Sequence, residues 1–163
     1  MHLKTVLSNV KWKKLLLCLA LPVGIGALAA VLTAGSMEAY KALLRPPFSP
    51  PGWVFPVVWT ILYILMGWGS YRIWISDAPK EKKRNALILY GVQLFFNFFW
   101  SLLFFRWELR LTAFFWLLGL WLLVYATIRL FYRVEDLAGD LLLPYLLWVT
   151  CAAYLNMGTF LLN

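Results

Sequence analysis

Three polar side chains recur at four-residue spacing in a segment that is otherwise aromatic and aliphatic. They are Gln93, Asn97 and Ser101. Residues four apart lie on the same face of an α-helix, so the two amides and the hydroxyl form one polar stripe. The stripe predicts either hydrogen bonding between helices or a site that offers donors and acceptors to a ligand. The stripe alone does not decide between these two interpretations.

A second polar face lies near the end of the chain. Trp148, Ala152 and Asn156 are also spaced four apart, and Tyr145 precedes Trp148 by three residues. Ala152 leaves room beside two larger groups on this helical face. The segment therefore offers an amide and aromatic rings around a gap.

Aromatic side chains also flank the polar stripe. Trp59 and Tyr63 are four residues apart on an earlier segment, and Trp100 lies three residues beyond Asn97. If these segments pack together, flat aromatic rings and a few hydrogen-bonding groups converge. Such a cavity suits a large, planar, amphipathic ligand.

Groups for catalysis or metal binding are scarce. His2 is the only histidine, and it lies in the N-terminal tail. The carboxylates all lie in or beside expected loops: Glu38, Asp77, Glu81, Glu108, Glu135, Asp136 and Asp140. No Cys or His cluster has metal-ligand spacing, and no glycine-rich phosphate loop occurs. We therefore expect no catalytic residue, no metal site and no required cofactor.

The composition predicts a membrane protein. Hydrophobic residues make up 63% of the chain and charged residues 13%, whereas soluble domains contain about 25% charged residues. Five uncharged intervals reach the roughly 18 residues of a spanning helix, at 15–37, 46–71, 85–105, 111–128 and 141–163. We predict an all-α integral membrane protein with a tail at 1–14 and one five-helix domain at 15–163. Its helices are expected at about 15–34, 53–75, 86–105, 111–132 and 141–162.

A proline-rich loop precedes the second predicted helix. Prolines 46, 47, 50 and 51 fix their own φ and disfavour helix in the residue before each, so the loop is extended and stiff until a helix begins near Trp53. We expect residues 45–53 to cover the mouth of the site as a lid.

The charge distribution predicts an orientation. The net charge is +8, but the basic residues flank apolar segments instead of forming one face, which argues against nucleic-acid binding. Eleven of them lie on the side of the N-terminus and only Lys41, Arg45, Arg106 and Arg110 on the other. By the positive-inside rule, the N-terminus is cytoplasmic, and the C-terminus and the proline loop face outward.

Three features of the predicted helices have simple interpretations. Residues 1–34 resemble a secretory signal, but the uncharged interval Leu15–Met37 is longer than the roughly 7–15 residues of a signal core. Gly26, Ala30 and Ala34 form a small-residue face that favours close helix packing. Cys18 and Cys151 lie within spans and are expected to be buried as small apolar residues.

Several motifs together carry a family resemblance. They are Pro50-Pro51-Gly52-Trp53, Trp59 with Tyr63, Met66-Gly67, Asn97 followed by Trp100-Ser101, and Leu143-Pro144-Tyr145-Leu146-Leu147-Trp148 through Ala152 to Leu155-Asn156. In this order and spacing, from about Gly24 to Asn156, the chain resembles the tryptophan-rich sensory protein or translocator protein (TspO, peripheral benzodiazepine receptor) family, in its bacterial type.

The resemblance implies a five-helix membrane bundle, often a homodimer, that binds porphyrins such as protoporphyrin IX. Some members also bind sterols and synthetic isoquinoline carboxamide or benzodiazepine ligands. The implied ligand-binding residues are Tyr40, Pro51, Trp53, Trp59, Tyr63, Asn97, Trp100, Ser101, Tyr145, Trp148, Ala152 and Asn156.

Two departures from the family pattern matter. Family members commonly have Lys-Pro-Ser-Trp where this chain has Arg45-Pro46-Pro47-Phe48, so the charge is kept and an indole is lost. The residues after Asn156 lack the Tyr and the basic residue of the animal sterol motif, so sterol binding by this segment is not predicted.

The leading functional hypothesis is a receptor for protoporphyrin IX or a similar haem-like tetrapyrrole in a membrane, expected to be the bacterial cell membrane, with transport or stress sensing as an extension. An alternative from another class is light-dependent porphyrin degradation, in which Trp59 and Trp148 react with light-generated radicals or oxygen species. A third possibility is a structural membrane protein without a ligand, which a bundle without a cavity between the second, third and fifth helices would favour.

Overall fold

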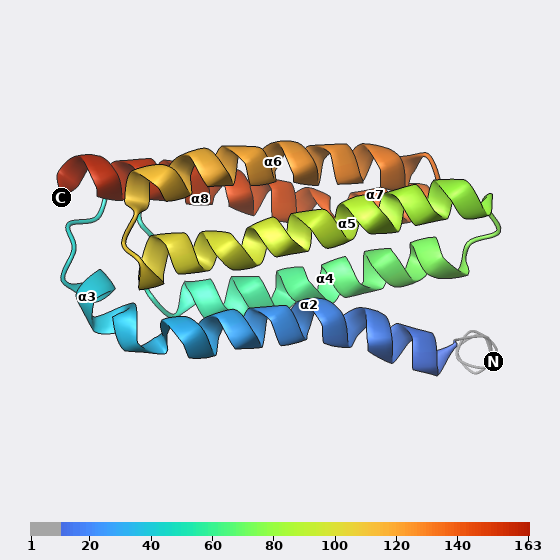
Figure 1. The fold of residues 1–163 in the computed structure, drawn as a ribbon, viewed down its shortest axis with the longest axis horizontal. Helices are drawn as coiled ribbons and strands as arrows, with labels where there is room; N and C mark the ends of the chain where they lie inside the picture. The colour runs from blue at the N-terminus through green and yellow to red at the C-terminus, as the bar shows by residue number, and fades with distance from the viewer. Residues whose placement is uncertain (1–10) are drawn as a thin grey trace.

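The computed structural model describes residues 11–163, and every regular element within that part of the chain is helical. Five long helices run back and forth, so that α2 begins at one end of the bundle and α8 finishes at the other (Figure 1). Each is long and apolar enough to cross a membrane. The predicted all-α membrane bundle is thus confirmed. Residues 1–10, which include His2, Lys4 and most of the predicted tail, lie outside the described residues.

The five spanning helices are α2 (Trp12–Thr33), α4 (Val54–Ile75), α5 (Lys80–Ser101), α6 (Arg110–Tyr132) and α8 (Leu143–Leu162). The predicted start of the third helix at residue 86 was late, because α5 begins directly after Pro79. The prediction placed the start where the charges end. Lysine, glutamate and arginine are good helix formers, so a helix continues through them beyond its apolar segment. The early start of α2 at Trp12 has the same cause, since Lys13 and Lys14 lie in its first turn.

Short helical elements connect or extend the spans. The chain after α2 forms a 3₁₀ turn, η1 (Ala34–Ser36), and then α3 (Met37–Lys41). Another short helix, α7 (Asp136–Asp140), precedes α8 and accounts for the late start of α8 at Leu143 instead of residue 141. These elements turn the chain without leaving backbone groups unpaired over a long stretch.

The end of α5 widens into a π-helical turn, η2 (Leu102–Arg106). Its wider spacing is visible in the backbone hydrogen bond from the Trp107 amide to the Leu102 carbonyl, at 2.9 Å. Glu108, just beyond it, has a φ of 55° and reverses the chain into α6. Such turns are rare and often occur at functional sites.

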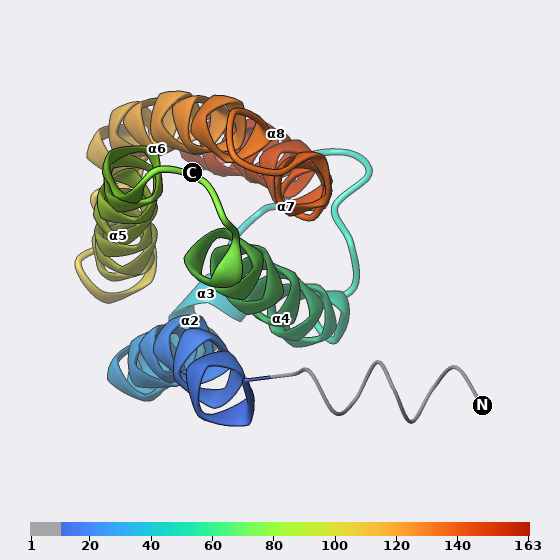
Figure 2. The same ribbon diagram turned by 90° about the vertical axis from the view of Figure 1, so that its right-hand side faces the viewer.

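The packing order of the helices is clear when the bundle is viewed along its length (Figure 2). α2 packs on α4, α5 packs on α6, and α6 packs on α8, while α7 lies against both α4 and α6. An ion pair between Arg72 and Glu135 also connects α4 to the segment before α7. α2 contacts α5 less extensively than it contacts α4, which leaves space on that side of the bundle.

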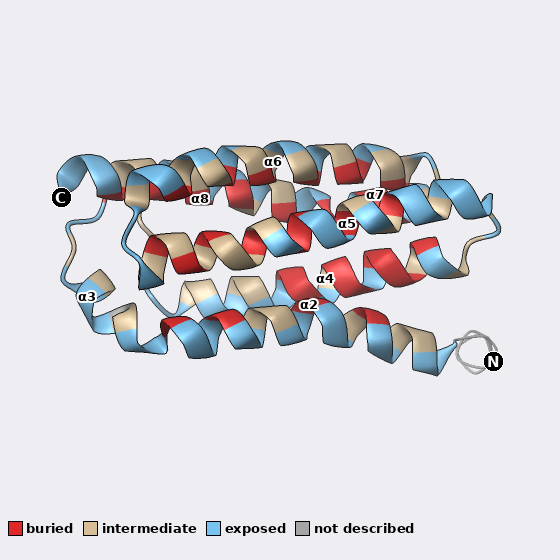
Figure 3. Ribbon diagram, in the orientation of Figure 1, coloured by how far each residue is buried: buried red, intermediate tan, exposed pale blue. Residues whose placement is uncertain are grey.

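Buried residues follow the inward faces of the helices, and exposed residues cover the outside (Figure 3). Many of the exposed side chains are large and apolar, among them Val31 at 73% exposure and Leu147 at 69%. A continuous apolar exterior of this kind suits hydrocarbon and not water. Cys18 is buried, as expected, but the prediction was wrong for Cys151, which lies on the outward face of α8.

At Gly67, the backbone of α4 lies close against the backbone of α2. A Cβ atom at this position would lie 2.8 Å from both the Cys18 carbonyl oxygen and the Leu19 Cα atom. Both are backbone atoms, so a side chain at residue 67 can be accommodated only if the helices move apart. Gly26 has a similar role on α2, where it packs against the ring of Tyr63.

We expect Gly67→Ala to destabilise the bundle by about 1–3 kcal/mol, because overpacking of a fitted interface forces the backbone to shift. Gly24→Ala is the matched control, because a Cβ at Gly24 on α2 meets nothing within 4 Å. Thermal unfolding in detergent, followed by size-exclusion chromatography, measures both. Equal melting temperatures for the two variants would contradict the close approach at Gly67.

Candidate ligand-binding site

A cavity of about 500 Å³ lies between α2, α4 and the end of α5, beside α3 and the proline loop. This volume falls within the roughly 300–1,000 Å³ of typical small-molecule sites. The lining consists of Gly26, Ala29, Ala30, Thr33, Ala34, Tyr40, Lys41, Arg45, Gly52, Phe55, Pro56, Trp59, Tyr63, Trp100, Ser101 and Phe105. It contains two cations and no carboxylate, so the cavity is apolar in its walls and positive at one edge.

Aromatic rings form the wall contributed by α4 and α5. Trp59 stacks on Tyr63, one helical turn further along α4, with 5.4 Å between ring centroids. The indole of Trp59 also lies 6.3 Å from that of Trp100 on α5, which stacks on Phe104 at 5.7 Å. Since i and i+4 residues share a helix face, Trp59 and Tyr63 present their rings on the same side. The result is a continuous aromatic surface along one side of the cavity.

The opposite wall comes from α2 and the first residue of η1, and it is built from small residues. Ala29, Ala30 and Ala34 line the cavity without filling it. The predicted small-residue face therefore has two roles, because Gly26 packs closely on Tyr63 while the alanines leave the space open. Sequence reasoning assigned this face to packing alone and missed α2 as a wall.

The mouth of the cavity is formed by α3 and the start of the proline loop. The ring of Tyr40 makes edge contacts with Phe104 and Phe105 of the π-helical turn, with centroids 5.8 Å and 5.1 Å apart. The guanidinium of Arg45 lies over the same Tyr40 ring, 5.6 Å from its centroid. Burial raises the pKa of the Tyr40 phenol, and the nearby Arg45 charge only partly opposes this. Tyr40 therefore keeps its hydroxyl proton to a higher pH than an exposed tyrosine does.

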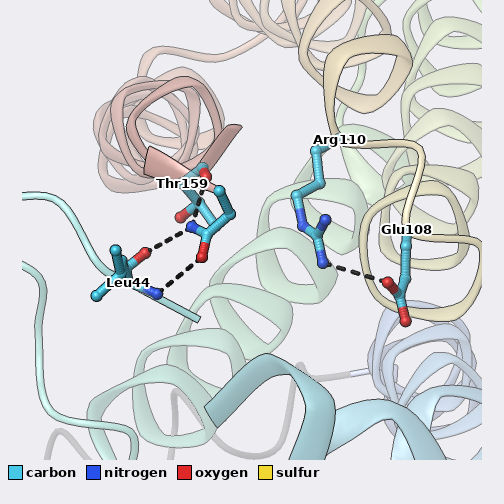
Figure 4. Close-up of polar contacts among 5 residues, drawn as sticks. Leu44, Glu108, Arg110 and Thr159 are labelled. Atoms are coloured by element: carbon cyan, nitrogen blue, oxygen red, sulfur yellow. Dashed lines mark hydrogen bonds and ion pairs between the residues drawn. The ribbon is translucent and has the colours of Figure 1, made fainter. Parts of the chain in front are cut away.

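The proline loop is fastened to the end of α8. The side chain of Asn163 accepts a hydrogen bond from the Leu44 amide and donates to the Leu44 carbonyl, both at 3.0 Å, and donates to the Thr159 carbonyl at 2.8 Å (Figure 4). Further along, the Tyr154 hydroxyl donates to the Pro47 carbonyl at 2.9 Å. These bonds hold the first part of the loop to one helix.

Pro46 and Phe48 differ sharply in their surroundings. Pro46 is buried against Gly158 of α8, where an added Cβ would lie 2.6 Å from the proline ring. Phe48 is 96% exposed and has a φ of 61°, which places its side chain at the outer tip of the loop. Beyond η2, Arg110 pairs with Glu108 at 3.3 Å (Figure 4).

The polar stripe predicted from the sequence divides into two parts. Asn97 accepts a hydrogen bond from the Tyr63 hydroxyl at 3.0 Å and donates to the Tyr145 hydroxyl at 2.9 Å. The Tyr145 hydroxyl in turn donates to Gln93 Oε1 at 2.9 Å, and Gln93 Nε2 lies 3.9 Å from the Met66 sulfur. All these residues are buried, so two of the three stripe residues bond to neighbouring helices. Ser101 is the stripe residue that lines the cavity.

Asn156 on α8 also has internal partners. Its Oδ1 accepts a hydrogen bond from the Trp100 indole N–H at 3.2 Å, and its Nδ2 donates to the Arg110 carbonyl at 2.8 Å. The side chain therefore orients an indole of the cavity wall and also bonds to the backbone at the start of α6. Both are positioning roles.

Of the predicted site residues, Tyr40, Trp59, Tyr63, Trp100 and Ser101 line the cavity. The others do not line it: Pro51, Trp53, Asn97, Tyr145, Trp148, Ala152 and Asn156. The expected wall on the last helix is thus replaced by a wall on α2. The reason is geometric, because Tyr145 and Asn156 of α8 are buried and use their polar groups on residues of α5 instead of facing open space.

Four of the residues that do not line the cavity contact residues that do. Asn97 bonds to Tyr63, and Asn156 bonds to Trp100. Tyr145 makes an edge contact with Trp59 at 6.2 Å, and Trp148 makes one with Phe55 at 5.8 Å. The sequence pattern therefore identified residues that belong to the site region but could not separate those that face the cavity from those that hold its wall.

Phe55, Phe105 and Lys41 are lining residues that sequence reasoning did not select. Phe55 and Trp59 are i and i+4 on one face of α4, a spacing that could have revealed Phe55. No sequence signal indicated Phe105, because its direction depends on the π-helical turn.

Comparison with known proteins gives consistent matches along nearly the whole chain. Residues 18–162 match the model of the TspO/MBR family. The chain is 35% identical over 150 residues to a tryptophan-rich protein TspO of Chlorobaculum tepidum, covering 91% of this chain and 95% of that protein. It is 37% identical over 159 residues to a tryptophan-rich sensory protein of Cereibacter sphaeroides, covering 95% and 94%. It is also 37% identical over 133 residues to a translocator protein of Bos taurus, covering 80% and 79%.

We expect Tyr145→Phe to lower stability by about 1–3 kcal/mol, because it leaves buried groups of Asn97 and Gln93 without their shared partner. Tyr125→Phe is the control, since Tyr125 lies exposed on the outer face of α6. Melting temperatures in detergent compare the two. A Tyr145→Phe variant as stable as Tyr125→Phe would show that the network contributes nothing.

Proposed function

Because this chain belongs to the TspO/MBR family, we propose that it is a membrane receptor whose main cavity binds protoporphyrin IX or a similar haem-like tetrapyrrole. Family membership agrees with the resemblance drawn from the sequence motifs. The observation that carries the proposal is the cavity itself, with one aromatic wall, one wall of small residues and two cations at its edge.

The walls suit a flat, rigid ligand. A porphyrin ring can lie against the surface formed by Trp59, Tyr63 and Trp100, while Ala30 and Ala34 leave room for its other face. Stacking on aromatic rings contributes about 0.5–1.5 kcal/mol per pair beyond the burial of apolar area. A structural protein without a ligand is the weaker alternative, because a bundle that needed only packing would gain stability by filling this space.

The edge of the cavity suits anionic groups. Lys41 and Arg45 line the mouth, and no carboxylate is present in the lining to neutralise them. Protoporphyrin IX carries propionate groups on one side of its ring. We propose that these point toward Lys41 and Arg45, with the apolar side of the ring inside.

We propose binding, with transport or stress sensing as its consequence, and not turnover. The relatives are named sensory or translocator proteins. The cavity lining contains no histidine or carboxylate that could act as a general acid or base. The photochemical alternative rested on Trp59 and Trp148, and of these two only Trp59 lines the cavity.

The protein is an integral membrane protein, and we propose the bacterial cell membrane as its location, with a cytoplasmic N-terminus. A homodimer is part of this proposal, whereas sterol binding is not.

The orientation places the proline loop outside, and Phe48 at its exposed tip is the position to test. In a variant with both native cysteines replaced by serine, we expect Phe48→Cys to react with a membrane-impermeant maleimide on intact cells. Reaction only after the cells are opened would reverse the orientation.

We expect Trp59→Leu to raise the Kd for protoporphyrin IX by about tenfold, because it removes a stacking surface worth about 1.4 kcal/mol. Binding is followed by the porphyrin absorption band in detergent, which does not depend on protein tryptophan. Trp68→Leu is the matched control on the same helix, since Trp68 is 49% exposed and outside the cavity lining. Equal effects of the two variants would remove the proposed stacking wall.

The same titration tests the cations. Lys41→Gln should weaken binding of protoporphyrin IX by roughly threefold, as for a partly solvated ion pair, but leave the affinity for its dimethyl ester unchanged.

Illumination of the bound porphyrin then distinguishes a receptor from an enzyme that degrades the porphyrin. Bleaching that is faster with wild type than with Trp59→Leu at equal occupancy would favour photochemical turnover.

A further inference from the structure

A groove of about 430 Å³ lies between the last turns of α6 and the first turns of α8, and we call it the α6–α8 groove. α6 ends and α8 begins at the end of the bundle where α2 begins, whereas α3 and the proline loop lie at the other end (Figure 1). The groove shares no lining residue with the porphyrin cavity. Its lining consists of Tyr125, Ile128, Arg129, Tyr132, Arg133, Leu143 and Leu146.

Two arginines give the groove a positive edge. Arg129 and Arg133 are four residues apart at the end of α6, so they share one helix face. Both are exposed, and neither forms an ion pair with a carboxylate of residues 11–163. The lining contains no carboxylate that could neutralise them. Two accessible guanidinium groups at one groove favour an anion that offers several oxygens, such as phosphate.

Three carboxylates follow in the next segment, and two of them have partners of their own. Glu135 pairs with Arg72 of α4. Asp140 accepts a hydrogen bond from the Tyr132 hydroxyl at 2.6 Å. Asp136 is exposed at the start of α7 and lies outside the groove lining. The bond to Asp140 ties the Tyr132 ring to α7, so this wall of the groove has a defined position.

The part of the groove that lies deeper in the membrane is apolar. Tyr125 precedes Arg129 by one helical turn, and its ring stacks on Trp121 with 5.8 Å between ring centroids. Leu143 and Leu146 form the facing wall on α8. Arg129 therefore lies where α6 leaves the hydrocarbon, with aromatic and aliphatic side chains on its membrane side. An occupant that fills the whole groove needs an anionic head and an apolar tail.

We propose that the α6–α8 groove binds one anionic phospholipid of the surrounding membrane. Its phosphate lies between Arg129 and Arg133, and one acyl chain lies along Tyr125 and Leu146. Basic pockets between spanning helices at the membrane surface recognise anionic lipid headgroups in this way. An arginine near the hydrocarbon is costly without a counter-charge, and lipid phosphate lies at the same depth. A zwitterionic lipid fits less well, because its cationic group would lie near two guanidinium groups.

The test uses native mass spectrometry of the full-length protein in detergent, with phosphatidylglycerol and phosphatidylethanolamine that carry the same acyl chains. We expect one phosphatidylglycerol per protomer to bind with a Kd roughly fivefold below that of phosphatidylethanolamine. An excess of sn-glycerol 3-phosphate, which has the phosphate without acyl chains, should not displace the lipid.

The double variant Arg129→Gln with Arg133→Gln should lose the preference for phosphatidylglycerol. Both side chains are exposed, so we expect the melting temperature to stay at the wild-type value. Lys82→Gln with Arg84→Gln is the matched control, because it removes two exposed cations from the first turns of α5, at the same end of the bundle and outside the groove lining. This control should keep the preference.

Three results would overturn the proposal. One is wild-type protein that binds phosphatidylethanolamine as tightly as phosphatidylglycerol. Another is an equal loss of preference in the two double variants, which would indicate a general attraction of anionic lipid to the basic end of the bundle. The third is displacement of the lipid by glycerol phosphate, which would indicate a site for a soluble phosphate. The first and third need no variant, and none of the three bears on the porphyrin cavity.

Discussion

The hydrogen-bonded chain from Tyr63 through Asn97 and Tyr145 to Gln93 fixes α4, α5 and α8 relative to one another. In hydrocarbon, apolar side chains gain little by leaving lipid for a neighbouring helix, so polar contacts of this kind have a large share in defining a single arrangement. Each hydroxyl and amide in the chain has a partner, and a shift of one helix would break several bonds together. The rest of the bundle is arranged around this fixed centre.

The cavity depends on the same chain. The Tyr63 hydroxyl bonds to Asn97, and this bond sets the direction of a ring on which Trp59 stacks. Tyr145 reaches Gln93 through its hydroxyl and touches Trp59 through its ring edge. A residue that never meets a ligand can therefore determine how flat the ligand-facing wall is. Stability and site geometry share residues on this side of the cavity.

The sequence was most informative where one physical constraint acts alone. The hydrophobic length needed to cross a bilayer located all five spans, and the prolines located the loop before α4. Helix ends were harder, because the chain from Lys80 to Asn85 is helical without being apolar. The π-helical turn at Leu102–Arg106 had no signal at all, since its leucines and phenylalanines also occur in ordinary membrane-spanning helices.

Predicting the site was limited in a different way. Four-residue spacing shows which side chains share a helix face, as for Asn97 and Ser101, but not how far that face is rotated toward a neighbour. Asn97 turned out to bond to Tyr63 and Tyr145, and Ser101, one turn further, lines the cavity. The wall on α2 was missed because alanines look the same in a tight interface and beside an open space.

The alanine wall has an evolutionary consequence. Ala30 and Ala34 line the cavity, and their methyl side chains take no part in hydrogen bonds; α2 buries only Cys18, Pro22, Ala29 and Thr33 among its residues. Replacing one of these alanines by valine or leucine would change the shape of the cavity while leaving the centre of the bundle intact. Ligand preference in this lineage can therefore drift through α2 one side chain at a time, without first acquiring compensating changes in the core.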